Sequence, residues 1–123
     1  MSILVDTSVW IDHLRSSNLE LIARLETGLV YIHPFVVGEL ACGNLADRNK
    51  VLSTLRSLPH AGVAGDDEVL FYIEKHRISG KGLGYLDMHL LACAALERLQ
   101  LWTLDRRLAQ VAAELGLQYP AIE

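Results

Sequence analysis

The stretch ILVDTSVW, residues 3–10, decides how the chain folds. A short apolar run that ends abruptly in a carboxylate predicts a buried strand, and residues 7–14 after it are predicted to form a short helix. The same alternation recurs further along. Apolar runs at residues 29–32 and 101–104 predict two more buried strands, residues 118–119 predict a weak final strand, and residues 60–64 are a further candidate.

Segments of helical period separate these runs. We expect helices over residues 19–26 and 34–42, from Asp47 or Asn49 to 58, from Asp66 and Asp67 to the loop at residue 79, and over 86–99 and 106–115. Strands joined through helices need crossover connections, which favour a mainly parallel sheet with helices on both faces. The expected fold class is therefore α/β, a three-layer α/β/α sandwich formed by one domain over residues 1–123.

Length and composition limit the classes of protein to consider. The 123 residues fit one domain, and 51% of them are hydrophobic, which is too many for a disordered chain. No apolar run approaches the roughly 20 residues of a membrane span, and no export signal opens the sequence. We expect a cytoplasmic protein without membrane contacts, in which Cys42 and Cys93 are buried thiols, with a disulfide between them as the alternative.

Carboxylates follow the predicted strands. Asp6 follows the first strand and Asp105 follows the third, so parallel strands would place both at one edge of the sheet. Asp87 begins the most apolar helix. For each of these three residues, capping a helix is the simpler alternative.

Glu39 is harder to explain as an ordinary surface residue. It lies on the same helical face as Phe35 and Val36, so we expect it among apolar side chains, where it needs a partner, a proton or a cation. The alternative is a carboxylate that reaches water from the edge of the apolar stripe.

Four carboxylates that converge on one crevice would repel one another by several kcal/mol, which a cation would offset. Mg²⁺ is the expected ion, with Mn²⁺ as a substitute, because both prefer oxygen ligands. The chemistry that follows is hydrolysis of a phosphodiester by metal-activated water.

Four blocks of the sequence resemble one known family. In order and spacing they are similar to the PIN-domain ribonucleases, and in particular to the VapC-type toxins of bacterial toxin–antitoxin pairs. The likeness covers essentially the whole chain, and the blocks together are far more specific than any one of them. They are residues 6–12 (DTSVWID), 34–40 (PFVVGEL), 86–92 (LDMHLLA) and 102–108 (WTLDRRL).

The resemblance implies a PIN-like fold and a Mg²⁺-dependent endoribonuclease. It implies an acidic pocket of Asp6, Glu39, Asp87 and Asp105, in which the three aspartates hold metal and Glu39 orients or deprotonates the attacking water. Hydroxyls that position carboxylates or water would come from Thr7, Ser8 and Thr103, although such hydroxyls are also ordinary helix caps. The family further implies RNA as substrate, a homodimer, and a small cognate antitoxin that occupies the pocket. The glycine-rich residues 80–85 depart from the family pattern.

A formal net charge of -4 is unusual for a protein that binds nucleic acid. Two divalent ions would offset this charge, and Arg77, Lys81, Arg106 and Arg107 are the candidates for contact with RNA near the site. The alternative for these four is a solvated helix surface.

Other functions fit less well. A haloacid-dehalogenase-type phosphatase needs a second aspartate two positions after the first, where Ser8 stands, and a receiver domain lacks its lysine after a late strand. A catalytically silent PIN-like module that binds RNA or a protein partner stays open as the second hypothesis.

Overall fold

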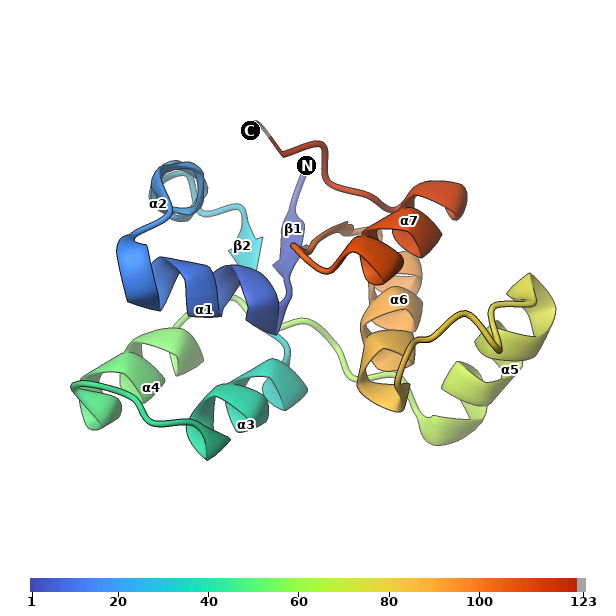
Figure 1. The fold of residues 1–123 in the computed structure, drawn as a ribbon, viewed down its shortest axis with the longest axis horizontal. Coiled ribbons are helices and arrows are strands. Elements are labelled where there is room, and N and C mark those ends of the chain that lie inside the picture. The colour runs from blue at the N-terminus through green and yellow to red at the C-terminus, as the bar shows by residue number, and fades with distance from the viewer. Residues whose placement is uncertain (122–123) are drawn as a thin grey trace.

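The computed structural model describes residues 1–121 and contains a small parallel sheet among helices (Figure 1). In chain order the elements are β1 (Ile3–Val5), α1 (Thr7–Ser16), α2 (Leu19–Glu26), β2 (Val30–Tyr31), α3 (Pro34–Cys42), α4 (Arg48–Arg56), α5 (Asp66–His76), α6 (Tyr85–Glu97), β3 (Gln100–Trp102) and α7 (Arg106–Glu114).

The three strands run parallel in the order β2-β1-β3, so β1 is central. Strands β2 and β3 end earlier than predicted, because backbone N–H groups beyond their ends donate hydrogen bonds to partners outside the sheet. The Ile32 N–H donates to the Pro59 carbonyl at 2.9 Å, and the Leu104 N–H donates to Ser8 Oγ at 2.9 Å. The strands expected at residues 60–64 and 118–119 are reduced to single bridges, Ile32 with His60 and Leu101 with Gln118.

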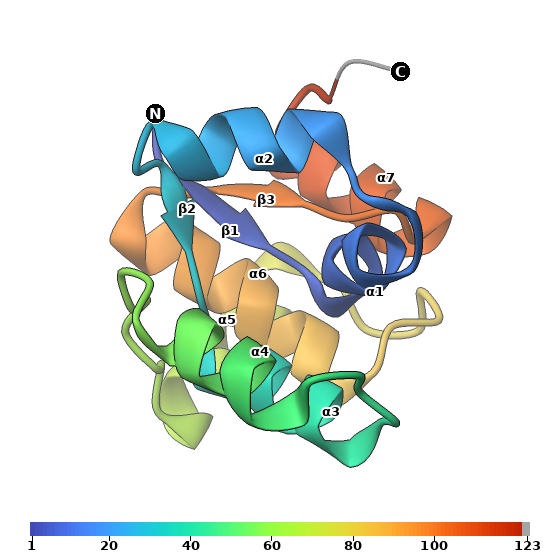
Figure 2. The same cartoon turned by 90° about the vertical axis from the view of Figure 1, so that its left-hand side faces the viewer.

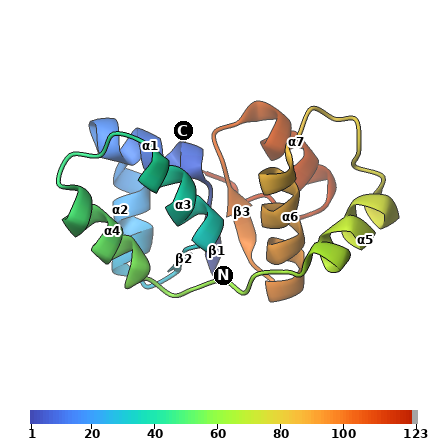
Figure 3. The ribbon, with the colours of Figure 1, turned by 90° about the horizontal axis from the view of Figure 1, so that it is seen from below.

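Helices cover both faces of the sheet, which confirms the predicted α/β/α arrangement. In Figure 1, α1 to α4 lie on one side of the strands and α5 to α7 lie on the other. Figure 2 looks through the first group onto the sheet, with α6 and α7 behind it. Seen from below in Figure 3, the two groups flank the strands, and α5 lies at one end of the molecule.

The core forms where these layers meet. It contains apolar side chains of all three strands, and α6 buries seven consecutive residues, Met88 to Ala94. Cys93 is buried there as predicted, but Cys42 is exposed at the end of α3, which corrects that expectation, and both thiols are free. Within residues 1–121, no helix is long and apolar enough to cross a membrane.

Strand order determines where chemically active side chains gather. The chain leaves β1 first toward β2 on one side and later reaches β3 on the other, so strand order reverses beside the carboxyl ends of β1 and β3. Val5 is in register with Trp102, and the Asp6 N–H donates to the Trp102 carbonyl at 2.9 Å. Residues that follow these two strands are therefore neighbours.

Truncating a buried side chain at the centre of the sheet should destabilise the folded protein. Leu4 is 0% exposed on the central strand, so we expect Leu4→Ala to lower the free energy of unfolding by about 2–5 kcal/mol. Leu19, which is 79% exposed at the start of α2, provides the matched control, and Leu19→Ala should change stability by less than about 0.5 kcal/mol. Urea denaturation measures both, and equal effects would contradict the assigned core.

Candidate active site

Asp6 is held by two hydroxyl groups from opposite ends of the chain. It is 6% exposed, and its Oδ2 accepts hydrogen bonds from Ser8 Oγ at 2.8 Å and Thr103 Oγ1 at 2.7 Å. Each hydroxyl oxygen also accepts a backbone N–H, from Leu104 and Asp105 respectively, so its own hydrogen is directed at Asp6. Although Asp6 is the N-cap residue of α1, its side chain makes no capping bond, so the simple capping interpretation is wrong here.

Glu39 lies in the open, which corrects the expectation that it sits among apolar side chains. The buried stripe of α3 consists of Val36, Val37 and Leu40, while Glu39 and Phe35 share the exposed face. The Glu39 carboxylate accepts a hydrogen bond from Thr7 Oγ1 at 2.5 Å. Thr7 follows Asp6 directly, so this bond links α3 to the start of α1 beside the buried aspartate.

Asp105 and Asp87 both serve helix starts. Asp105 caps α7, with Oδ1 accepting from the N–H groups of Arg107 at 2.9 Å and Leu108 at 3.1 Å, as the simpler alternative predicted. Asp87 Oδ2 accepts the Gly84 N–H at 3.2 Å in the first turn of α6. Capping occupies one oxygen of each carboxylate and does not exclude a second role for the other.

The charges of the other three carboxylates act on Asp87. Burial raises the pKa of Asp87, and the charges of Asp6, Asp105 and Glu39 raise it further, against the lowering effect of the Gly84 N–H. Neither of the two ion pairs found within residues 1–121 involves any of these four residues. A region of like charge, without a basic partner, therefore lies at the reversal point of the sheet.

The donor chemistry of this region fits a hard divalent cation, since every group offered is a carboxylate or hydroxyl oxygen. The spacing is looser than that of a formed site. Over residues 1–121, no three Asp, Glu, His or Cys side chains lie close enough together to hold a metal ion. One carboxylate acts on the charge of another over a longer distance than a metal–ligand bond spans. The effect of the other charges on Asp87 and the loose spacing therefore agree if the carboxylates must move closer together, or bind through water molecules, to hold an ion.

Two of the four predicted RNA-contact residues, Lys81 and Arg107, line one small hollow. Lys81 Nζ lies 3.9 Å from Glu114 Oε2. Arg106 lines a different hollow beside Thr103, and Arg77 ends α5 with a positive φ of 53°.

The side chain of Arg107 lies against the glycine loop. Gly82 has a φ of +79°, and a Cβ there would lie 2.8 Å from Arg107 Nη1. Only glycine fits this position without displacing the guanidinium, so Gly82 leaves room for a basic side chain against the loop.

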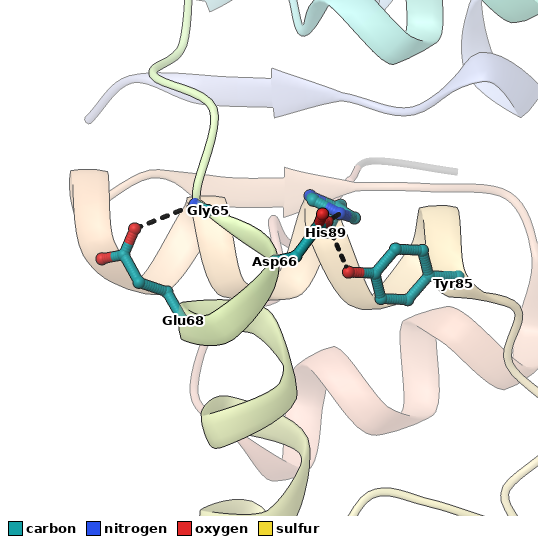
Figure 4. Close-up of polar contacts among 5 residues, drawn as sticks. All are labelled: Gly65, Asp66, Glu68, Tyr85 and His89. Atoms are coloured by element: carbon teal, nitrogen blue, oxygen red, sulfur yellow. Dashed lines mark hydrogen bonds and ion pairs between the residues drawn. The ribbon is translucent and has the colours of Figure 1, made fainter.

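A cluster of polar side chains beside Asp87 was not predicted from the sequence (Figure 4). Tyr85 Oη donates to Asp66 Oδ1 at 2.7 Å, and Nε2 of the buried His89 lies 3.5 Å from the same oxygen. Tyr85 and His89 flank Asp87 on α6, so Asp66 fastens the first turn of α5 to the turn that carries Asp87. The i, i+4 spacing, which places the two rings on one face of the helix, was the available signal in the sequence.

His33 was not predicted from the sequence either. Its Nδ1 accepts the Phe35 N–H at 3.0 Å and caps α3, the helix that carries Glu39. Burial, together with the nearby His89, lowers the pKa of His33 to about 4. His33 is therefore neutral at physiological pH, as an acceptor of this hydrogen bond must be.

Comparison with known proteins identifies the fold family. The model of the PIN domain matches residues 3–114. The chain belongs to the PIN domain family. This PIN domain is 43% identical over 116 residues to Ribonuclease VapC32 of Mycobacterium tuberculosis, covering 94% of each chain, in both strain CDC 1551 / Oshkosh and strain ATCC 25618 / H37Rv.

Solved structures share the fold at lower identity. A toxin–antitoxin complex from Klebsiella pneumoniae matches with a TM-score of 0.63 and 23% identity, over 85% of this chain and 87% of that one. PAE2754 from Pyrobaculum aerophilum matches with a TM-score of 0.61 and 18% identity, over 96% and 91% of the two chains. FitAcB from Neisseria gonorrhoeae matches with a TM-score of 0.61 and 23% identity, over 90% and 93%.

Removing the charge of Asp87 should stabilise the protein. Its raised pKa makes the ionised form less favourable in the folded state, so this penalty is absent below the ordinary pKa of 3.8 and complete above the raised value. Wild-type stability therefore falls as pH rises through that window. Asp87→Asn keeps an acceptor for the Gly84 N–H, so its Tm in metal-free buffer should exceed that of the wild type at pH 7.5, by about 4 °C for each kcal/mol recovered.

At pH 4 the increase in Tm of Asp87→Asn over the wild type should be smaller, which gives the experiment an internal control. Differential scanning calorimetry with a chelator at both pH values measures it. A variant that is less stable than the wild type at pH 7.5 would contradict the inferred repulsion.

Proposed function

We propose that this PIN domain is a Mg²⁺-dependent endoribonuclease, acting as the toxin of a toxin–antitoxin pair in the cytoplasm. The observation that carries the proposal is the unneutralised group of carboxylates Asp6, Glu39, Asp87 and Asp105 at the reversal point of the sheet. The 43% identity to a curated ribonuclease supports RNA as the substrate. In this proposal residues 1–123 act as one nuclease domain.

Each residue of the site has a distinct role in this proposal. Asp6, Asp87 and Asp105 would hold Mg²⁺, or Mn²⁺ in its place. When bound, the ion supplies an activated water and offsets negative charge on the phosphodiester. The Ser8 and Thr103 hydroxyls point one carboxylate oxygen of Asp6 in a fixed direction.

Glu39 acts as the base in the proposed reaction. It is exposed to solvent, so it can take up a proton from an attacking water and release it. Thr7 donates to its Oε1, which restrains the side chain on the side of α1 that carries Asp6. A positioned base of this kind typically contributes about 10²–10⁴-fold to the rate.

The partners follow from the same reasoning. Lys81 and Arg107, which line one hollow beside the glycine loop, would bind RNA phosphates, with Arg77 and Arg106 as further contacts. We also propose a small cognate antitoxin that occupies the acidic site, and a homodimer. The match to a toxin–antitoxin complex supports the antitoxin.

A catalytically silent PIN-like module that binds RNA or a protein is the second candidate. The loose spacing of the carboxylates over residues 1–121 favours it. Within residues 1–121 none of the four carboxylates makes an ion pair. Their retention favours the nuclease instead, because a silent site gains nothing from their repulsion.

Cleavage of RNA should depend on Asp6 and on a divalent ion. In Asp6→Asn the amide oxygen still accepts from Ser8 and Thr103, so we expect a folded protein whose cleavage falls to background. Glu26→Gln is the control: Glu26 is an exposed carboxylate at the end of α2, outside the proposed site, so cleavage should persist. Purified proteins are incubated with a panel of cellular RNAs, with Mg²⁺ or with chelator, and the cut ends are mapped. Cleavage by the wild type in the presence of chelator would contradict the mechanism, and so would cleavage by Asp6→Asn at the wild-type rate.

A further inference from the structure

Four ring side chains lie in series between α6 and α3. Tyr85, the first residue of α6, packs edge-on against His89 with the ring centroids 4.6 Å apart, and His89 packs in the same way against Phe35 at 4.8 Å. The Phe35 ring lies 5.0 Å from that of His33, the residue that caps α3. Edge-to-face pairs stabilise a contact by about 0.5–1.5 kcal/mol beyond the area that they bury. These four residues are called the ring series below.

The ring series connects two helices whose carboxylates repel each other. Asp87 lies two residues before His89 on α6, and Glu39 lies one turn after Phe35 on the same face of α3. The charge of Glu39 is one of those that raise the pKa of Asp87. Within residues 1–121, no hydrogen bond or ion pair joins α3 to α6. Packing of side chains, including the ring series, therefore keeps these two helices at their distance.

Asp66, the first residue of α5, anchors the ring series at its α6 end (Figure 4). Its Oδ1 accepts a hydrogen bond from Tyr85 Oη at 2.7 Å and lies 3.5 Å from His89 Nε2, so one oxygen contacts two neighbouring rings. The side chain of Asp66 is 80% exposed, whereas that of His89 is 2% exposed. An exposed carboxylate thus restrains a buried ring.

Stability alone does not explain a histidine at position 89. Within residues 1–121, Nδ1 of the buried His89 has no hydrogen-bond partner. A buried polar nitrogen without a partner costs about 1–3 kcal/mol, which an apolar side chain would avoid. What the imidazole offers in return is its other nitrogen, Nε2, which faces Asp66.

Asp66 is separate from the acidic region around Asp87. The charges that raise the pKa of Asp87 are those of Asp6, Asp105 and Glu39. Asp66 can therefore affect Asp87 by restraining the first turn of α6, in which Asp87 lies, and not through its charge.

We propose that Asp66 is a positioning residue for the acidic site. Through Tyr85 it fixes the first turn of α6, and through the ring series it fixes the distance between Asp87 and Glu39. The inference rests on the nuclease proposed above and deepens it by naming a residue outside the acidic region on which cation binding depends. Groups that orient metal ligands typically change metal affinity or activity by about 10–100-fold, and Asp66 acts one contact further out, so we expect the lower end of this range.

Isothermal titration calorimetry of the chelator-treated full chain with Mn²⁺ tests the proposal. Asp66→Ala and Tyr85→Phe each remove the hydrogen bond, so each should raise the dissociation constant about tenfold. Asp66→Asn removes the charge but keeps an acceptor oxygen for Tyr85, so it should bind Mn²⁺ as the wild type does. Tyr72→Phe is the matched control on α5, because the Tyr72 ring packs against His76 at 4.3 Å and its hydroxyl makes no hydrogen bond within residues 1–121.

The stoichiometry of binding separates positioning from loss of folding. A misplaced ligand raises the dissociation constant and leaves one molecule of protein per site, whereas partial unfolding lowers the stoichiometry. The double variant Asp66→Ala with Tyr85→Phe should bind Mn²⁺ no more weakly than either single variant, because both changes remove the same bond. The initial rate of cleavage of cellular RNAs in Mg²⁺ should fall in the same order as the affinity.

Wild-type affinity in both Asp66→Ala and Tyr85→Phe would overturn the positioning role and leave the proposed nuclease intact. Binding by Asp66→Asn as weak as that by Asp66→Ala would also overturn it, because the effect would then belong to the charge. A wild type that binds no Mn²⁺ would overturn the metal-dependent nuclease and this inference together.

Discussion

The parallel pairing of β1 with β3 is the constraint on which the acidic region depends. Register places Val5 beside Trp102, so Asp6 and Thr103, almost a hundred residues apart in sequence, bond at 2.7 Å. The helices that begin after these strands and after the glycine loop carry Asp105 and Asp87, and burial, together with the charges of Asp6, Asp105 and Glu39, raises the pKa of Asp87. Folding energy from the apolar core is what holds these like charges together.

The alternation of apolar runs with helical segments was enough to predict the order of elements and the α/β/α layers, because burial of a parallel sheet leaves a strong pattern. The ends of the strands were not predictable in this way. Whether Leu104 continues a strand depends on the distant Ser8 hydroxyl that accepts its N–H, and the apolar character of residues 101–104 says nothing about that bond. The bridges at His60 and Gln118 are equally dependent on tertiary neighbours.

The candidate site was also predictable only in part. The identity of the acidic residues was available from their positions after strands and at helix starts, but their environments were not. Helical spacing correctly grouped Phe35 with Glu39, yet it could not show that this face of α3 is open. The capping alternative proved right for Asp105 and wrong for Asp6, since only the fold decides which donor is within reach. His89 and its contact with Asp66 depend on how α5 packs against α6.

The central proposal is that these carboxylates bind a divalent cation. Isothermal titration calorimetry of the chelator-treated wild type with Mn²⁺ at neutral pH measures this directly, without any RNA. We expect saturable binding that Mg²⁺ competes away and that disappears when Asp6 and Asp87 are both replaced by asparagine. No saturable heat in the wild type, or the same heat after both replacements, would contradict the account.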